Sequence, residues 1–354
     1  MGTRNTIVLP ISSDSQFNRG TVEALPNAPG NIVLLPGDGQ IQVTWSSVFD
    51  VIGYRLYYST SSFSAIDDPG VTRVTINDEL STDYLLEGLT NGVTYYIRIL
   101  SVSGAGYGLL SNEYSTTPSN YLNAYSTTFD GGTEYVEFGT APDFHFSNSD
   151  PFTIVAWVKY TSSFGGQQTI VSNQDSTSSY SGIDFHKAGN ETLEIEIRHN
   201  WGNRIRVAST TKFDTLDKWY HVAATYDGSG VAAGVNIYID GVQEIPDINN
   251  DTLVETIATW ATWRIATRSN ESNWHLGSLD EIAVYSSELT ESQIEEIYNL
   301  GIPTNLIYLS SASDLISWWR MGDGDTATTI FDAVGSNDGT LVNMDATNYV
   351  EDTP

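Results

Sequence analysis

Two glutamates, Glu194 and Glu196, have a spacing that could serve enzymatic chemistry. They alternate with Ile195 and Ile197 in a strand-like segment, so both carboxyl groups lie on one face. Hydrolysis of a glycan needs two carboxyl groups about 5 to 10 Å apart, one of them protonated. The Glu-x-Asp-x-x-Glu pattern of glycan hydrolases is absent, however, because Arg198 follows. We therefore predict that these glutamates are solvent-facing acids on an amphipathic strand.

The histidines form no catalytic or metal-binding pattern either. The chain contains neither the His-Glu-x-x-His spacing of a metal site nor a Gly-x-Ser-x-Gly nucleophile turn. Its five histidines are scattered as His145, His186, His199, His221 and His275. The sequence thus predicts that the protein is not an enzyme.

Tryptophans in loop-like surroundings could bind carbohydrate instead. Trp201 lies within HNWGNR and Trp260 within ATWATW. A ring face can stack on the C–H face of a sugar, while nearby polar side chains bond its hydroxyl groups. We predict Trp201 and Trp260 as carbohydrate-binding residues, with packing against the protein as the alternative for each ring. The tryptophans that lie in strand patterns are predicted core residues: Trp157, Trp219, Trp318 and Trp319.

Antiparallel strands must position these side chains. Val235, Ile237 and Ile239 alternate with polar residues, which is the period of a strand with one buried face. Asp240-Gly241 follows directly, a strong signal for a two-residue hairpin turn.

One short helix is expected later in the chain. Thr290 and Gln293 fit a capping box, Ile294 and Ile297 supply an apolar stripe, and Gly301 can close the C-terminus. The helix should be about 10 residues long.

Three motifs occur in a characteristic order: WYHVAATYDG at 219–228, VNIYIDGV at 235–242 and GSLDEIAVY at 277–285. Upstream, Phe129-Asp130-Gly131 and the segment 151–158 extend the pattern. This order resembles the laminin-G-like, concanavalin A-like jelly-roll family. The resemblance implies a jelly-roll sandwich with one short helix.

Short strand patterns separated by turn signals fill residues 27–118. Pro29 opens the first strand, Trp45 takes a buried aromatic position, and the segment 89–95 has the spacing of a tyrosine corner. These residues resemble a fibronectin type III domain. The resemblance makes Tyr95 a structural residue.

A length of 354 residues is consistent with about two domains. We predict an all-β protein: a fibronectin type III sandwich at 27–118 and a jelly-roll sandwich at 119–354, preceded by an arm or anchor at 1–26. Residues 313–354 resemble the usual opening strand and loop of the second family, yet they come last. A truncated extra domain could not bury a core, so we favour a circularly permuted jelly roll.

The laminin-G-like resemblance also implies a calcium ion. Calcium takes oxygen ligands from carboxylates and loop carbonyls. By that resemblance we nominate Asp280, Glu281, Asp332 and Asn337 as ligands. The alternative is ordinary turn chemistry, because Asp and Asn also bond their own backbone in turns.

The composition narrows the class of partner. A net charge of −29, from 44 acidic and 15 basic residues, disfavours nucleic acid and anionic membrane surfaces. There is no cysteine, no apolar run long enough to span a membrane, and no signal-peptide pattern in MGTRNTIVLPISSDSQ. Modules of these two families usually act outside cells. Release inside a virus particle would reconcile these facts, and so would a signal lost in cloning or export by a route that leaves no N-terminal mark.

We therefore expect a non-enzymatic surface protein of a tailed bacteriophage virion, made in the host cytoplasm. The N-terminal arm would contact other virion proteins, and the jelly roll would bind a host-surface glycan, without membrane insertion. Homo-oligomer formation is left open. The alternative is a bacterial cell-surface adhesin or an accessory polysaccharide-binding protein.

Overall fold

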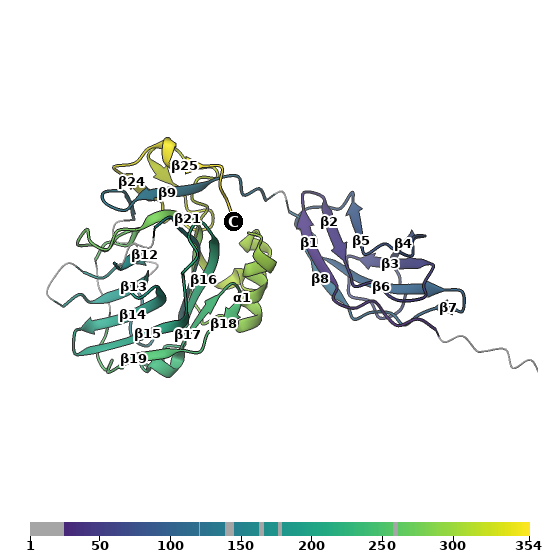
Figure 1. Ribbon diagram of the computed structural model, residues 1–354, viewed down its shortest axis with the longest axis horizontal. Coiled ribbons are helices and arrows are strands. Elements are labelled where there is room, and N and C mark those ends of the chain that lie inside the picture. The colour runs from purple at the N-terminus through teal and green to yellow at the C-terminus, as the bar shows by residue number, and fades with distance from the viewer. Residues whose placement is uncertain (1–24, 120, 139–144, 163–165, 176–178, 258–260) are drawn as a thin grey trace, which may run out of the picture. The chain divides into compact units, whose positions relative to one another are not determined.

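Strands make up nearly all the regular structure of the protein (Figure 1). The computed structural model describes residues 25–119, 121–138, 145–162, 166–175, 179–257 and 261–354. The chain separates into two compact units, Met1–Asn120 and Tyr121–Pro354. We refer to them as unit 1 and unit 2. The all-β prediction is confirmed.

Unit 1 contains two antiparallel sheets. The three-stranded sheet has the order β1-β2-β5, with β1 Val33–Gly37, β2 Gln40–Thr44 and β5 Asp83–Glu87. The other sheet has the order β4-β3-β6-β7, and β8 also pairs with β6. Its strands are β3 Gly53–Ser59, β4 Thr72–Ile76, β6 Tyr95–Ser103, β7 Gly106–Tyr107 and β8 Tyr114–Thr116.

The core of unit 1 includes Trp45, which the sequence predicts as a buried aromatic residue. Trp45 and Tyr54 are buried, with ring centroids 5.2 Å apart. The predicted tyrosine corner is present, because the Tyr95 hydroxyl accepts a hydrogen bond from the Thr90 N–H at 3.1 Å. This bond ties the start of β6 to the connection that precedes it.

Unit 2 contains a nine-stranded sheet with the order β19-β15-β14-β13-β12-β20-β10-β24-β23. In chain order its strands are β10 Tyr135–Glu137, β12 Gln168–Ser172, β13 Gly182–Lys187, β14 Thr192–Asn200, β15 Asn203–Lys212, β19 Asp247–Asp251, β20 Arg264–Ile265, β23 Thr329–Ile330 and β24 Gly339–Val342.

The second sheet of unit 2 has the order β18-β17-β16-β11-β21-β9-β25, and β22 also pairs with β21. In chain order these are β9 Ser126–Asp130, β11 Phe152–Tyr160, β16 Trp219–Tyr226, β17 Val235–Ile239, β18 Val242–Gln243, β21 Leu276–Tyr285, β22 Leu315–Trp319 and β25 Tyr349–Val350.

The main core of unit 2 draws on both sheets. Alternate residues of β14, such as Ile195 and Ile197, share one apolar cluster with Ile154 of β11 and Val222 of β16. A second cluster covers the opposite face of the eight-stranded sheet, where α1 packs. Trp157, Trp318 and Trp319 are buried as predicted, whereas Trp219 is only partly buried.

The C-terminal segment completes the sheets of unit 2. Strand β24 pairs with β10, β22 pairs with β21, and β25 pairs with β9. Residues from the two ends of unit 2 therefore lie side by side. The strands of 313–354 belong to this sandwich and do not start another one.

Two local predictions are met in detail. Asp240 and Gly241 both have positive φ, 49° and 77°, which a tight hairpin turn between Ile239 and Val242 requires. Helix α1, Glu291–Tyr298, begins with the Thr290–Gln293 capping box.

The end of α1 differs from prediction. Asn299, not Gly301, takes the left-handed position that ends the helix, with φ of 45°. The helix is therefore 8 residues long. A short 3-10 turn, η3 Asn299–Gly301, follows it.

Other 3-10 turns in the described part of the chain are η2 Ala232–Gly234, η4 Leu306–Tyr308, η5 Ala312–Asp314 and η6 Ala346–Asn348. Within the described ranges, no helix combines the length and the apolar character needed to cross a membrane.

Candidate functional site

The outer face of the nine-stranded sheet carries a cluster of charged side chains. On β13, Ile183 and Phe185 point into the core, so Asp184 and His186 occupy the opposite face. The same alternation on β14 places Glu194, Glu196 and Arg198 there, since the isoleucines between them are core residues. We call the cluster on this face, with its bonded neighbours, the polar network: Gln167, Gln174, Asp184, His186, Glu194, Glu196, Arg198, Arg204, Arg206 and Arg268.

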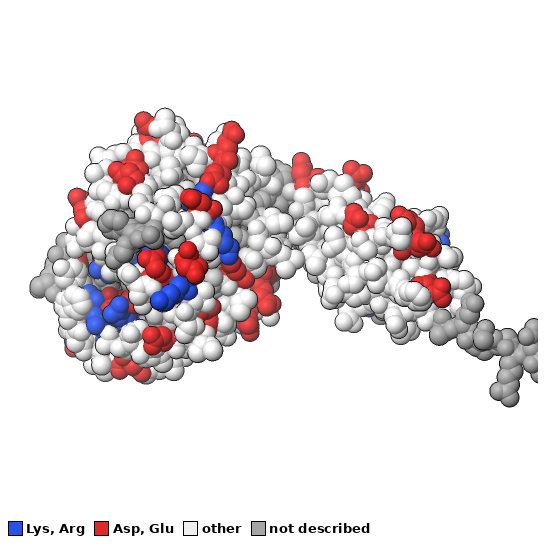
Figure 2. Space-filling view, in the orientation of Figure 1, with Lys and Arg blue, Asp and Glu red and all other residues white. Residues whose placement is uncertain are grey.

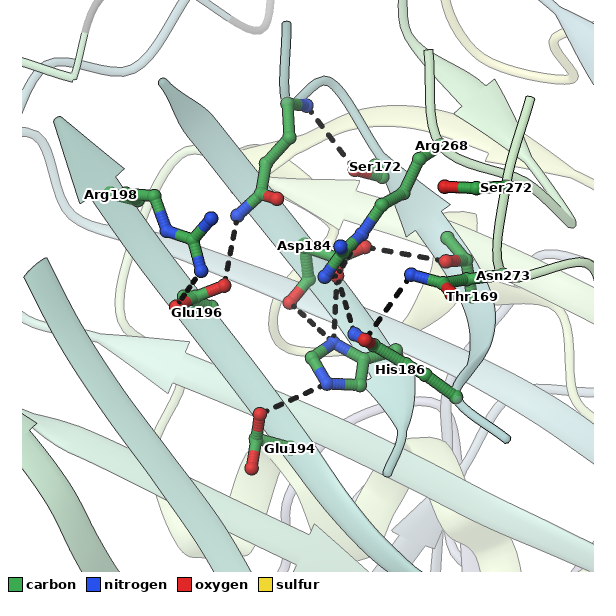
Figure 3. A network of polar contacts seen from close by, with 12 residues as sticks. Thr169, Ser172, Asp184, His186, Glu194, Glu196, Arg198, Arg268, Ser272 and Asn273 are labelled. Carbon is green, nitrogen blue, oxygen red and sulfur yellow. Dashed lines mark hydrogen bonds and ion pairs between the residues drawn. The ribbon is translucent and has the colours of Figure 1, made fainter. Parts of the chain in front are cut away.

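One half of the polar network is centred on His186 (Figure 3). Its Nδ1 lies 2.9 Å from the Asp184 carboxylate, and its Nε2 lies 3.0 Å from Glu194. Arg268 donates to Asp184 through Nε at 2.8 Å. Arg206 donates to Glu194 at 2.6 Å. Every carboxylate in this half therefore has a cationic partner.

Electrostatics keeps these groups charged. Burial alone would raise the pKa of Asp184, but Arg268 and His186 hold it well below its usual range. Burial would lower the pKa of His186, but Asp184 and Glu194 raise it to about 9. The pKa of Glu194 is lowered, because His186 and Arg206 outweigh its burial. At neutral pH the imidazole is protonated and both carboxyl groups are ionised.

The other half of the polar network is centred on Glu196. Arg198 forms an ion pair with it, and Arg204 donates to the same oxygen at 3.0 Å. The second oxygen accepts a bond of 3.3 Å from the Gln174 amide. Two guanidiniums therefore share one carboxylate.

Trp201 lies at the edge of this second half. It occupies the turn between β14 and β15, and 60% of its surface is exposed. The Arg198 guanidinium lies 4.1 Å from its ring centroid, and that of Arg204 lies 5.0 Å away. Tyr180 meets the indole edge-on at 6.0 Å. The predicted loop position of Trp201 is thus observed, whereas Trp260 lies outside the described residues.

The prediction that Glu194 and Glu196 face solvent is wrong. They are 3% and 2% exposed. Their alternation with isoleucines is as expected. Arg206, Arg268 and Gln174, however, bond the carboxylates on this face of the sheet. Because Glu194 is held ionised, it cannot act as the protonated acid that glycan hydrolysis requires.

Two of the nominated calcium ligands lie together on β21. Asp280 accepts a hydrogen bond from the Asn123 amide at 2.8 Å. Glu281 accepts one from the Trp318 indole and lies 3.6 Å from Arg320. Burial and the Glu281 charge raise the pKa of Asp280 well above its usual range, and burial raises the pKa of Glu281 to about 7.

The other two nominated ligands form a separate turn. One Asp332 oxygen accepts from the Ser317 hydroxyl at 2.6 Å, and Asn337 donates to the same hydroxyl at 2.9 Å. Asp332 also accepts four backbone N–H groups, from Trp318, Val334, Gly335 and Asn337. This is the turn chemistry that stood as the alternative to a metal.

The four nominated residues therefore do not fit a calcium ion as they are arranged. Asp332 is surrounded by hydrogen-bond donors, and Arg320 places a positive charge beside Glu281. Over the described ranges, no three residues of the His, Cys, Asp or Glu type are placed to hold a metal. Calcium stays a prediction that only chelation can test.

Most members of the polar network were missed at the sequence level. The alternation in GIDFHK could have placed Asp184 and His186 on one face, as it did Glu194 and Glu196. Arg268 gives no such signal, because it is 84 residues away from Asp184 in the chain. Contacts of that range depend on the folding of the whole sandwich.

Two family models match the chain. The model of the fibronectin type III domain matches residues 27–117. The model of the concanavalin A-like lectin/glucanases superfamily matches residues 130–295. The two families and their predicted order are confirmed.

One curated relative is a Kelch domain-containing protein of Sulfurisphaera tokodaii. It is 35% identical over 98 residues, which is 28% of this chain. The chain spans only 13% of that relative's length.

Each of the similar solved structures covers part of this chain. A pentraxin of Limulus polyphemus is 15% identical, covers 62% of this chain and 95% of its own, and has a TM-score of 0.38. The CBM40 of a Ruminococcus gnavus sialidase, bound to sialyllactose, is 15% identical and covers 49% and 96%, with a TM-score of 0.39. An Fn3-like protein from Clostridium thermocellum is 22% identical and covers 28% and 99%, with a TM-score of 0.23.

Proposed function

We propose that this chain, which joins a fibronectin type III domain to a concanavalin A-like domain, is a non-enzymatic carbohydrate-binding protein. The observation that carries the proposal is the position of Trp201. The residue is 60% exposed, and its ring lies beside the polar network on the outer face of the nine-stranded sheet. An exposed indole next to fixed polar groups is what a sugar ring requires.

The chemistry of this face suits a sugar. The indole offers an apolar surface to the C–H groups of a pyranose, and the guanidiniums of Arg204 and Arg206 can donate to its hydroxyl groups. Arg206 keeps 38% of its side chain exposed, so it remains accessible at the rim. Strand β15 holds both arginines, which reduces the entropy that they lose on binding.

Binding to bacterial envelope polysaccharides tests this proposal directly. Retention on a panel of such polysaccharides should fall by up to about tenfold in Trp201→Ala, since a stacking contact is worth about 0.5 to 1.5 kcal/mol. Phe331→Ala is the matched control, because Phe331 is 43% exposed and follows β23 at the other end of the sheet. Equal retention of wild type and Trp201→Ala would rule out this face as the binding site.

For the place of action, we propose the surface of a tailed-bacteriophage virion. The fibronectin type III domain would serve as a spacer for the binding domain, and the segment 1–26, most of which lies outside the described residues, would contact other virion proteins. A bacterial cell-surface adhesin is the alternative. Detection of the protein in the mass spectrum of purified particles would support the virion as its location. Its absence from those particles would favour the cell-surface alternative.

A further inference from the structure

The polar network carries a local excess of positive charge in a strongly acidic chain. The chain as a whole has a net charge of −29. Within the network, four guanidiniums and one protonated imidazole face only three carboxylates, a surplus of two positive charges. Figure 2 shows basic and acidic side chains interspersed on the visible side of the molecule. A cationic region in an acidic protein favours an anionic ligand.

Arg198 is the cation whose bonding is incomplete. Its side chain is 3% exposed, and it pairs with Glu196 through Nη2. Among the residues that the structure describes, its Nε and Nη1 have no hydrogen-bond partner. Leaving buried donors unbonded costs about 1 to 3 kcal/mol, more for a charged group. A ligand that accepts hydrogen bonds would recover that free energy on binding.

Gln174 provides the complementary group. Its amide nitrogen donates to Glu196, as Arg198 does, so the two side chains meet at one carboxylate. Its side-chain carbonyl oxygen is buried, and no donor within the described part of the chain bonds it. The unbonded donors of Arg198 and the unbonded acceptor of Gln174 therefore both lie beside Glu196. An inorganic anion would satisfy only the donors, whereas a sugar with both an acidic group and a hydroxyl would satisfy both.

The rings next to Arg198 fit the same ligand. Its guanidinium lies 4.1 Å from the Trp201 ring centroid and 5.9 Å from that of Tyr180. A sugar stacked on the exposed part of Trp201 would thus bring a ring substituent close to Arg198. Arg198 would then contact the acidic substituent of the sugar unit whose ring stacks on Trp201.

We infer that the ligand of this face is an acidic glycan, in which Arg198 binds the carboxylate of a uronic or similar acidic sugar stacked beside Trp201. The inference rests on the carbohydrate-binding function proposed above. Guanidinium is well suited to this role, since its bonds to carboxylates are charge-assisted.

Paired polysaccharides test the inference on the full chain. Hyaluronate, alginate and polygalacturonate are compared with the same polymers after reduction of their carboxyl groups, and dextran sulfate serves as a general polyanion. We expect at least one acidic polymer to bind at least tenfold more tightly than its reduced form. Arg198→Met, which keeps the apolar stem, should abolish that preference.

Each result is decisive. Equal binding of acidic and reduced polymers would overturn the inference but leave carbohydrate binding intact. Binding of no polysaccharide by the folded protein would overturn both. Dextran sulfate bound as tightly as the acidic polymers, with the same dependence on Arg198, would replace carboxylate recognition by general polyanion binding. The wild-type comparison stands even if Arg198→Met does not fold.

Discussion

The His186 ring lies 2.9 Å from the carboxylate of Asp184, two residues earlier on the same strand. Because the residue between them points into the core, both side chains emerge on the outer face of the sheet. Glu194, on the neighbouring strand, closes the other side of the ring at 3.0 Å. A buried histidine between two carboxylates is therefore a cation at neutral pH.

This arrangement predicts a loss of stability in alkali. Burial lowers the pKa of His186, but the two carboxylates raise it to about 9, above its ordinary value of 6.5. The protonated imidazole therefore makes its full contribution to the free energy of unfolding below pH 6.5. That contribution is lost as the pH rises through about 9. In His186→Gln, the free energy of unfolding of unit 2 should decline less between pH 6.5 and 9.5 than in wild type. Urea titrations at several pH values measure the difference, and parallel curves would contradict the prediction.

His221 predicts the opposite behaviour. The ring is fully buried near Trp157 and Tyr298, and neither ring nitrogen has a hydrogen-bond partner among the described residues. Burial lowers its pKa from 6.5 to about 3. The neutral imidazole therefore contributes to the free energy of unfolding above pH 6.5. That contribution is lost as the pH falls towards 3.

The variant His221→Phe isolates this effect. At 1.36 kcal/mol for each unit of pH, neutral His221 makes wild type lose about 2 kcal/mol between pH 6.5 and 5. His221→Phe keeps an aromatic ring and removes the titrating group. Between pH 6.5 and 5 its free energy of unfolding should therefore fall about 2 kcal/mol less than that of wild type. The same acid dependence in both proteins would show that His221 becomes protonated in the native state.

Chelation tests the predicted calcium site. A ligand that binds only the native state must raise the melting temperature. Because Asp332 already accepts hydrogen bonds from Ser317 and from a series of backbone amides, we expect EDTA to leave the melting temperature unchanged. A decrease that calcium reverses, and that is absent in Asp332→Asn, would establish the site instead.

The fold was predictable because its signals are local. The Asp240-Gly241 turn and the Thr290–Gln293 capping box depend on neighbouring residues, and both appear as predicted. The choice of Asn299 over Gly301 at the helix end could not be made, because both residues tolerate left-handed backbone.

The site was less predictable, for a physical reason. Alternation showed that Glu194 and Glu196 share a face, but it could not show that the face is covered. Arg268 approaches from a distant segment, and Arg206 from the neighbouring strand. Burial of a polar face depends on these tertiary contacts, which leave no periodic pattern in the sequence.

Tyr95 provides a test of unit 1 that is independent of the site. Its hydroxyl accepts the Thr90 N–H at 3.1 Å, and the tyrosine itself is 8% exposed. Tyr95→Phe keeps the packed ring but removes the acceptor of that N–H. Because Thr90 is exposed and water can replace the hydroxyl, the loss should cost about 0.5 to 1.5 kcal/mol.

For a unit of this size, 1 kcal/mol corresponds to about 4 to 8 °C in melting temperature. Scanning calorimetry of the full chain should therefore show the transition of unit 1 lowered by several degrees, with that of unit 2 unchanged. Tyr107→Phe is the matched control, because Tyr107 is 55% exposed and its hydroxyl should contribute little. If Tyr95→Phe and Tyr107→Phe melted alike, the corner hydrogen bond would be shown to add nothing, and the Tyr95 ring alone would account for its place in the core.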